Sequence, residues 1–501
     1  MIKNKILISC LLSSYVVASS IQTDIKNDDK SDYKAPRLAG DSLAIKSLNK
    51  ENENSVFSIK EMFTKGKVKG LIRYSGQYRD TSFHSTQSGS TPNNNKIQQY
   101  SALGGYLGYE TANYNNISLG ATFYTAQKFG PNPDDRIGIG GLNEDGDKAN
   151  SYAVLGEAYL KYETETQDVR VGRREMPNYR FVSLSNIRFT PITHEGATYE
   201  NKMLEDVKFT FGYITTQKDR NSEKFVGMVQ AARVSKSKIE GDYDISNYTG
   251  ENYSGQSKPM LMGAVSYTKD DFSAEFWDYY VEDFVNTAYI YSDYNFKINK
   301  ELTITTALQY ANQSNVGSNV AGDIDSWFYG LKAQATLKSG VTVFAAYNEV
   351  AYNENSYAGG TIFVRWGTPQ MFNSFQVQDS ELAGTKSVGI GAQFELGHMG
   401  IIPNTVIRFR YANYDMPDSL SDRYAAQDRS EATFDLRYSF NKNDGFGIFT
   451  EMDGLSVQFR VAYDDYKTDY NYDAYKIAHG YNFDDVTKDF VDTRLYIDYL
   501  F

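Results

Sequence analysis

The end of the chain, FVDTRLYIDYLF, alternates apolar or aromatic side chains with polar ones and finishes on Phe501. Successive side chains of a strand point to opposite faces. One face therefore holds the apolar and aromatic residues Leu495, Ile497, Tyr499 and Phe501, and the other holds the charged residues Asp492, Arg494 and Asp498. This pattern is typical of the closing strand of an outer-membrane β-barrel, which has lipid on one side and a lumen on the other. The alternative is a half-buried strand of a soluble β-sandwich.

The start of the chain favours export. Lys3 and Lys5 precede an apolar run, Ile6–Val17, and small residues follow it, so residues 1–20 are predicted to be a secretory signal peptide. Cys10 also suggests a lipoprotein signal, but cleavage there would cut the apolar run in half. We therefore expect the single cysteine to be removed, which leaves no thiol for a disulfide, a metal site or a nucleophile.

Composition narrows the class further. The 501 residues have a mean hydropathy of -0.52, and no apolar run after the signal reaches the roughly 18 residues that a membrane-spanning helix needs. A barrel needs no such run, because its strands expose only alternate residues to lipid. The 41 Tyr and 29 Phe suit the aromatic girdles of such a barrel. A net charge of -12, together with export, disfavours nucleic-acid partners.

The pattern along the chain predicts about 18 spanning strands, each of roughly nine to eleven residues. They are expected to begin near residues 66, 99, 116, 152, 167, 194, 205, 259, 271, 287, 301, 327, 341, 386, 403, 430, 453 and 490. The segments from 194 and 259 have the weakest alternation. Residues 66–501 are thus predicted to form an all-β, antiparallel transmembrane barrel.

The connections between these strands alternate in length, as in barrels with short periplasmic turns and long outer loops. Two depart from the rule: 283–286 is short on the outer side, and 441–452 is long on the other. The long ones are 79–98, 128–150, 175–193, 218–258, 312–326, 351–385, 415–429 and 465–489. Ahead of the barrel, residues 21–65 are predicted to be a periplasmic segment. It includes a short helix near 56–63 that leads into the first strand, or plugs or docks on the periplasmic mouth.

Strand alternation also predicts which cations face the lumen. A Lys or Arg on the lipid face costs about 2–4 kcal/mol near the midplane, so strand arginines should point inward. We call the predicted inward set the basic ladder: Arg73, Arg408, Arg410, Arg437, Arg460 and Arg494. Such a set could pass an anion or carboxylate from one guanidinium to the next. The structural alternative is that these arginines pair with inward acids such as Asp435 and Asp498.

A channel of this size needs something to narrow it. The third outer loop, 175–193, is the best candidate, because it is bounded by Pro177 and Pro191 and carries Arg180 and Arg188. Its apolar residues suit packing against the inner wall. The alternative is a surface loop with incidental charges.

Three motifs, LGEAYLKYE, VGRREMPNY and IRFTPITHEGATYE, resemble porins of the OprD family, especially those of Campylobacterota, and so does the opening GKVKGLIRY. The resemblance implies an 18-stranded channel with a constriction loop and a basic ladder, used for diffusion of small, often carboxylate-bearing solutes. Arg174 stands where the motif usually has Gln, and His194 is also atypical. The constriction set implied by the loop and these motifs is Arg173, Arg174, Arg180, Arg188, Pro191 and His194.

The sequence thus predicts an outer-membrane porin for passive diffusion of small hydrophilic solutes and ions, without a cofactor. Its other expected partners are outer-membrane lipid, lipopolysaccharide and, through Phe501, the barrel-assembly machinery. Catalysis is disfavoured, because only 4 His occur and neither GxSxG nor HExxH is present. A calcium site at Asn143, Asp145 and Asp147 lacks the distal Glu of a calcium hand. Adhesion through the long loops is the alternative function, and anion or cation selectivity and homo-oligomerisation stay open.

Overall fold

The computed structural model describes residues 55–84, 95–136, 139–145, 148–183, 185, 188–232, 258–320, 322–364, 366–367, 371–378, 380–417, 428–440, 454–466 and 487–501. The predicted signal peptide and residues 21–54 lie outside this part of the chain, and so does Asp147 of the candidate calcium site. What the sequence indicates for these segments therefore stays a prediction.

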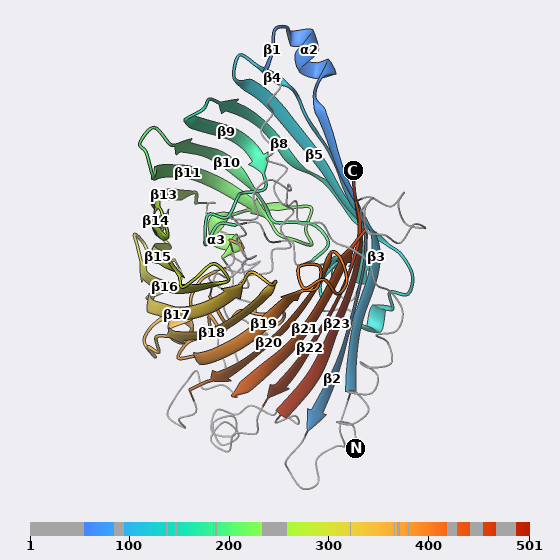
Figure 1. The fold of residues 1–501 in the computed structure, drawn as a ribbon, viewed down its shortest axis with the longest axis vertical. Coiled ribbons are helices and arrows are strands. Elements are labelled where there is room, and N and C mark those ends of the chain that lie inside the picture. The colour runs from blue at the N-terminus through green and yellow to red at the C-terminus, as the bar shows by residue number, and fades with distance from the viewer. Residues whose placement is uncertain are drawn as a thin grey trace.

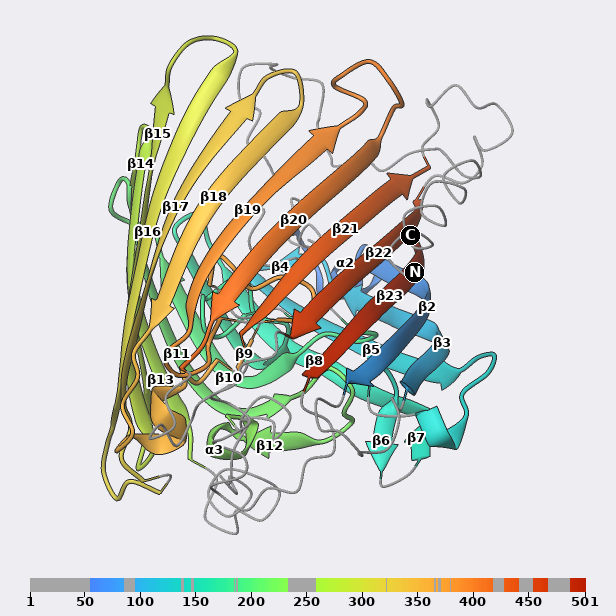
Figure 2. The same cartoon turned by 90° about the horizontal axis from the view of Figure 1, so that it is seen from below.

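The described residues form one closed antiparallel β-barrel of 18 strands. Figure 1 shows the strands as a ring, and Figure 2 shows neighbouring strands running obliquely side by side. The barrel strands are β2 (Lys67–His84), β3 (Asn95–Glu110), β5 (Ile117–Lys128), β8 (Tyr152–Glu163), β9 (Gln167–Arg174), β10 (Thr193–Asn201), β11 (Val207–Lys218), β13 (Met260–Lys269), β14 (Phe272–Val281), β15 (Val285–Lys297), β16 (Leu302–Asn315), β17 (Asp325–Leu337), β18 (Val341–Val350), β19 (Lys386–Glu395), β20 (Thr405–Asp415), β21 (Arg429–Ser439), β22 (Leu455–Tyr466) and β23 (Thr487–Leu500).

Every predicted strand, including the two with weak alternation, begins within a few residues of an observed one. The predicted outer loop 79–98 is wrong at its edges, because β2 continues to His84 and β3 begins at Asn95. These two strands stay paired as far as Ser82 with Asn95. Polar side chains did not end the hairpin, since the pairing is made by backbone hydrogen bonds.

The seam between the first and last strands closes the barrel. β2 pairs with β23 from Leu71 opposite Leu500 to His84 opposite Thr487. At its end the Gly70 N–H donates to the Phe501 carbonyl at 2.9 Å. A Cβ on Gly70 would lie 2.1 Å from the Phe501 ring, so a larger residue at this position would displace the last side chain. We call this end of the barrel, which has the short connections, the turn end, and the other the loop end.

The two faces of the wall differ as the alternation predicted. Exposed apolar side chains such as Val68 (61% exposed) and Leu107 (57%) lie on the outer face. The opposite face carries buried polar groups, among them Arg73, Arg460 and Arg494. No helix in the described part of the chain is both long and apolar enough to cross a bilayer.

Several short helices, turns and strands lie at the two ends of the barrel. At the turn end, β1 (Ser55–Val56) pairs with β4 (Asn113–Tyr114), and helix α2 (Ile59–Thr64) follows β1. The helix begins where the Ser58 hydroxyl accepts the Glu61 N–H, which satisfies a free donor of the first turn. On the loop side lie the 3-10 turn η2 (Asp134–Arg136), β6 (Asn143–Asp145), β7 (Lys148–Asn150), β12 (Phe225–Gly227), α3 (Met228–Ala231) and the 3-10 turn η5 (Tyr357–Gly360).

Two long connections enter the barrel instead of staying outside it. We call them loop L3 (residues 175–192) and loop L7 (residues 351–385). The largest apolar cluster joins L3 and L7 to the inner faces of β13–β17 and to α3, through residues such as Phe181, Trp277, Phe328, Phe363 and Trp366. Figure 1 shows coloured loop segments and α3 within the ring of strands. The lumen is therefore narrowed by the chain itself.

Candidate pore constriction

One row of register partners crosses the wall where the chain ends meet. Gln393 is opposite Arg408, Arg408 opposite Asp435, Asp435 opposite Arg460, Arg460 opposite Arg494, and Arg494 opposite Gln77. We call these six residues the register row. Neighbouring strands lie about 4.8 Å apart and tilt by about 40°, so each step moves the row about 3 Å along the barrel axis. The row is thus an inclined series of polar groups from β19 to β2.

Within the row, each guanidinium has a short-range partner. Arg408 Nη2 donates to Gln393 Oε1 at 2.8 Å. Arg460 Nε lies 3.0 Å from Asp435 Oδ2, and both side chains are buried. Arg494 Nη2 donates to the Gln376 carbonyl of L7 at 3.1 Å, whereas its buried Nη1 has no hydrogen-bond partner among the described residues.

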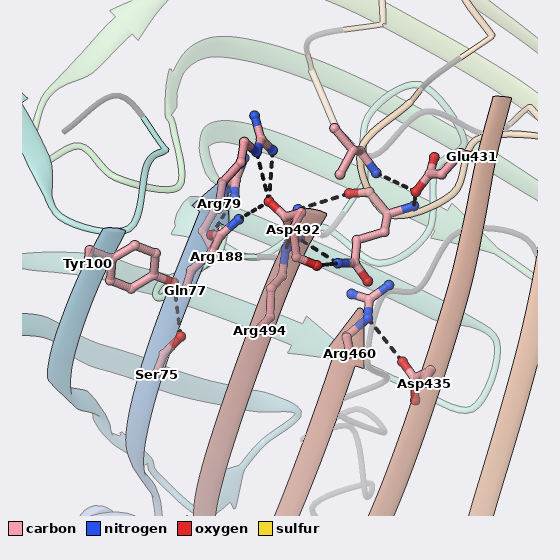
Figure 3. Close-up of polar contacts among 12 residues, drawn as sticks. Ser75, Gln77, Arg79, Tyr100, Arg188, Glu431, Asp435, Arg460, Asp492 and Arg494 are labelled. Carbon is pink, nitrogen blue, oxygen red and sulfur yellow. Dashed lines mark hydrogen bonds and ion pairs between the residues drawn. The ribbon is translucent and has the colours of Figure 1, made fainter. Parts of the chain in front are cut away.

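Beside the row, the buried carboxylate of Asp492 collects donors from two strands and one loop (Figure 3). Its Oδ2 accepts from Gln77 Nε2 and Arg79 Nη2, both at 2.8 Å. Its Oδ1 accepts from Arg494 Nε at 2.6 Å and from Gln376 Nε2 at 3.0 Å. One acid therefore holds β2, β23 and L7 together.

The other predicted ladder residues, Arg73, Arg410 and Arg437, lie on the inner face of the wall. Arg73 donates Nε and Nη2 to both carboxylate oxygens of Asp498, at 2.7 and 2.6 Å. Arg410 is buried, donates to the Thr433 hydroxyl at 3.2 Å, and lies 4.6 Å from the centre of the Phe375 ring. Arg437 shares the face of Asp435 by alternation. The structural alternative thus holds for the geometry of two pairs, Arg73–Asp498 and Arg460–Asp435, while the role of the ladder in permeation stays a prediction.

Loop L3 contacts the wall on two sides of the lumen, at β14 and at β2. Its Phe181 ring packs on Tyr279 of β14 and Tyr289 of β15, with ring centres 5.6 and 5.5 Å apart. The Arg180 guanidinium donates two hydrogen bonds to the carboxylate of Glu275 on β14, and its Cζ lies 3.9 Å from the centre of the Tyr291 ring. These strands lie across the ring from β2 (Figure 1). On the turn side of this anchor, a cavity of about 460 Å³ is lined by residues that include Asn178, Lys208, Glu275 and Trp277.

The other end of L3 places Arg188 against β2 and beside the register row. Arg188 Nη1 donates to Gln77 Oε1 at 2.8 Å, and its carbonyl accepts from Arg73 Nη1 at 3.2 Å. Among the described residues no carboxylate lies within ion-pair distance of Arg188. Burial and the positive charges of Arg494 and Arg220 lower the pKa of Arg188 to about 10, so it stays charged at neutral pH. The constriction therefore contains a cation that none of the described acids pairs with directly.

Loop L7 forms the other side of the constriction, which the sequence analysis missed. The buried carboxylate of Glu431 on β21 accepts three successive backbone N–H groups of L7, those of Gln376, Val377 and Gln378, at 2.9–3.0 Å. Earlier in L7, Trp366 Nε1 donates to the Met228 carbonyl at 3.0 Å. L7 contains the apolar run Ile362, Phe363 and Val364, followed by Trp366 and by further apolar residues such as Phe372 and Phe375. This is the signal that singled out L3, and it would have identified L7.

Part of the predicted constriction set is placed wrongly. Arg173 and Arg174 end strand β9, and His194 belongs to β10, so they flank L3. Arg173 alternates with the exposed Val171, pairs with Glu195 at 2.8 Å, and lies over the Phe225 ring, so it is on the outer face. The reason is that successive side chains of a strand point to opposite faces, so the neighbours Arg173 and Arg174 lie on opposite sides of the wall.

The remaining members of that set are inside. Arg174 points inward, where Nη2 donates to the Thr198 hydroxyl at 2.8 Å. The Pro191 carbonyl accepts from the buried Lys218 Nζ at 2.9 Å. His194 is buried, with Nε2 at 3.0 Å from the Trp366 carbonyl and 3.1 Å from Gln217 Oε1, so it contacts L7 rather than the aqueous path.

The described residues hold no group of three His, Cys, Asp or Glu side chains that could bind a metal ion. The predicted calcium loop includes Asp147, which lies outside them.

A closed barrel with apolar residues outside, charged residues inside and loops that narrow the lumen defines a transmembrane β-barrel channel. The family model for outer membrane porins of the OprD family matches residues 130–484. The chain therefore belongs to the OprD family of outer membrane porins, as the resemblance implied.

Solved structures support the same fold. The chain is similar to OccK9 (OpdG) of Pseudomonas aeruginosa, with a TM-score of 0.65 and 15% identity, covering 87% of this chain and 99% of that one. It is also similar to OpdK of the same organism with vanillate (TM-score 0.63, 15% identity, 87% and 98% covered) and to its OpdL (TM-score 0.63, 14% identity, 87% and 99% covered). No curated protein matches the sequence.

Proposed function

We propose that this porin passes small hydrophilic solutes and ions by passive diffusion, and that carboxylate-bearing solutes bind at the constriction between Arg188 and the register row. The observation that carries the proposal is the position of Arg188. Its charge lies beside Arg494 with no acid in ion-pair contact among the described residues, and Arg494 Nη1 lacks a hydrogen-bond partner there. A carboxylate accepts such donors through charge-assisted hydrogen bonds, and it relieves the repulsion between the two cations.

The inclination of the register row supports a path rather than a single site. Arg408, Arg460 and Arg494 follow one another around the wall while the row moves along the axis. Gln393 orients the guanidinium of Arg408, and Asp435 orients that of Arg460 and offsets its charge. An anion would thus meet successive donors without any one binding it too tightly to release it.

The similar structure of OpdK contains vanillate, a small carboxylate. At 15% identity this likeness concerns the fold. It makes carboxylates a reasonable first class of solute to test on this chain. The outer-membrane lipid, lipopolysaccharide and assembly-machinery contacts expected from the sequence belong to the same proposal.

The test is the single-channel current of the purified protein in a planar bilayer under a salt gradient. Benzoate is added as a carboxylate probe, and benzamide is its uncharged counterpart. We expect benzoate to block the current and benzamide to block it far less. Arg188→Gln should weaken the benzoate block about tenfold, because a charge-assisted hydrogen bond is worth about 1.5–3 kcal/mol. Arg408→Ala and Arg437→Ala should weaken it less.

The matched control is Arg173→Gln, which removes the same charge from the outer face. It should leave both the block and the reversal potential unchanged. If Arg188→Gln and Arg173→Gln behave alike, carboxylate binding at the constriction is wrong although the channel function stands. A folded barrel without any conductance would contradict the channel itself.

A further inference from the structure

Helix α2 is fixed to the turn end of the barrel by a small set of contacts. Met62 and Val56 bury themselves against Ala112, next to β4. The Ala112 N–H donates to the Met62 carbonyl at 2.9 Å. The hydroxyl of Tyr109 on β3 donates to the Phe63 carbonyl. The helix is therefore held in one place, and these contacts are with the wall and its turn rather than with the loops of the lumen.

The contact with Tyr109 shows which side of the wall the helix occupies. Tyr109 alternates with Leu103 and Leu107, which are 37% and 57% exposed on the outer face of β3. The end of α2 thus meets the outer face, where the spanning strands present apolar groups to lipid. On the neighbouring strand β2, Val68 continues the same exposed face.

The helix itself is two-sided. Residues follow one another by about 100° around a helix axis, so Ile59, Met62 and Phe63 form one apolar arc, and Lys60, Glu61 and Thr64 form the polar one. Met62 is buried at the barrel edge of the apolar arc. The rest of the arc is uncovered, since Ile59 is 62% exposed and Phe63 53%, and the preceding Phe57 is 93% exposed. Isolated exposed apolar residues are common, but three on one short segment are not.

We propose that the β1–α2 segment is an interfacial anchor whose apolar arc inserts into the phospholipid leaflet at the turn end. The arc continues the lipid-facing surface of β2 and β3, which fixes its level at the boundary of the bilayer. Lys60 and Lys65 lie on or beside the polar side, where they meet anionic headgroups. Glu61 pairs with Lys65 at 2.8 Å and so does not repel that surface strongly.

The chain allows a direct test, because Cys10 is its single cysteine. In a full-length Cys10→Ala background, one cysteine is introduced at Ile59, Phe63 or Phe57 and given a nitroxide label. Thr64→Cys on the polar arc is the matched control. The folded barrels are reconstituted in phosphatidylethanolamine–phosphatidylglycerol vesicles, and the accessibility of each label to oxygen and to a water-soluble nickel complex is measured.

Insertion predicts a ratio of oxygen to nickel accessibility that is several-fold higher for Ile59→Cys and Phe63→Cys than for Thr64→Cys. Equal ratios at all positions would show that the arc faces water, and would overturn the proposal. Labels shielded from both reagents would show that protein covers the arc, from a second copy or another part of this chain, which also overturns it. If the helix variants do not fold, Phe57→Cys decides alone, because that side chain is almost fully exposed and its replacement removes no packing.

Discussion

Arg180 Nε and Nη2 donate to the two carboxylate oxygens of Glu275, at 2.7 and 2.5 Å. This pair joins the middle of L3 to the wall across the lumen from β2, and the Arg180 side chain is almost fully buried. The same carboxylate accepts from Trp277 Nε1 at 2.8 Å, so it is held independently of the loop. The arginine is thus the movable half of the anchor.

Arg180→Met should release L3. Removing one partner of a buried pair costs about 3–5 kcal/mol, and Glu275 is left without its counter-charge. Single-channel recordings should therefore show a larger and noisier conductance than the native channel. Arg173→Met is the control, because it breaks an ion pair on the outer face, and it should leave the current unchanged. An unaltered current in Arg180→Met would mean that L3 is held mainly by Phe181 and its neighbours.

Asp492→Asn should make the constriction more attractive to anions. Asp492 holds Arg79 and Arg494, and its replacement leaves both cations without this counter-charge. The reversal potential under a salt gradient should shift toward anion selectivity, and the barrel should lose about 3–5 kcal/mol of stability. Asp278→Asn, on the outer face of β14, is the control for the loss of one negative charge. A shift of equal size in both variants would refute the assignment of Asp492 to the constriction.

Glu431→Gln should weaken the attachment of L7 to strand β21. The two oxygens of the Glu431 carboxylate accept three backbone N–H groups. A glutamine amide keeps one of these oxygens and replaces the other with an NH2 group, which donates and cannot accept. At least one backbone N–H would therefore lose its acceptor. The cost should be about 1–3 kcal/mol for the unsatisfied groups. Hydrogen exchange at residues 376–378 should accelerate, and the conductance should rise. Glu349→Gln, near Tyr329 and Tyr347, serves as the control. Unchanged hydrogen exchange in Glu431→Gln would show that Glu431 does not hold L7 in place.

Glu175, the first residue of L3, should make stability depend on pH. Burial, and then the negative charge of Glu157, raise the pKa of Glu175 from 4.5 to about 7. Because the folded state holds this proton more tightly than the unfolded one, the stabilisation is complete below the unfolded pKa and is lost as the pH rises through the folded pKa. The free energy of unfolding should decline between about pH 4.5 and 7 through this group. In Glu175→Gln that part of the decline should vanish, and an identical pH profile would refute it.

The seam offers a test of barrel closure. Gly70→Val should reduce the yield of folded barrel, because the new side chain would occupy the position of the Phe501 ring. Gly263→Val on β13 is the control, since a Cβ there meets nothing within 4 Å. Folded yield can be read from the heat-dependent mobility of the barrel on a gel. Equal yields would show that Phe501 has room to move aside.

The strands could be predicted from sequence because lipid imposes one rule on every alternate residue. In β22, Val457, Phe459 and Val461 fix the outer face, so Arg460 could only point inward, and it does. The error at Arg173 shows the limit of the rule, since a shift of one residue places a side chain in lipid or in the lumen. The loop contacts follow no period. Glu431 and Gln376 come together only through the fold, and no local pattern pairs them.

The salt bridge between Arg73 and Asp498 joins residues that are 425 positions apart. Loop-closure entropy grows only slowly with length, so this distance costs little in equilibrium stability, about 0.6 kcal/mol for each doubling. Its consequence is kinetic: contacts between distant positions form late, and chains dominated by them fold slowly. Strands β2 and β23 at the seam can pair only after all the strands between them have formed the wall. Until then, each keeps an open edge that another chain could join.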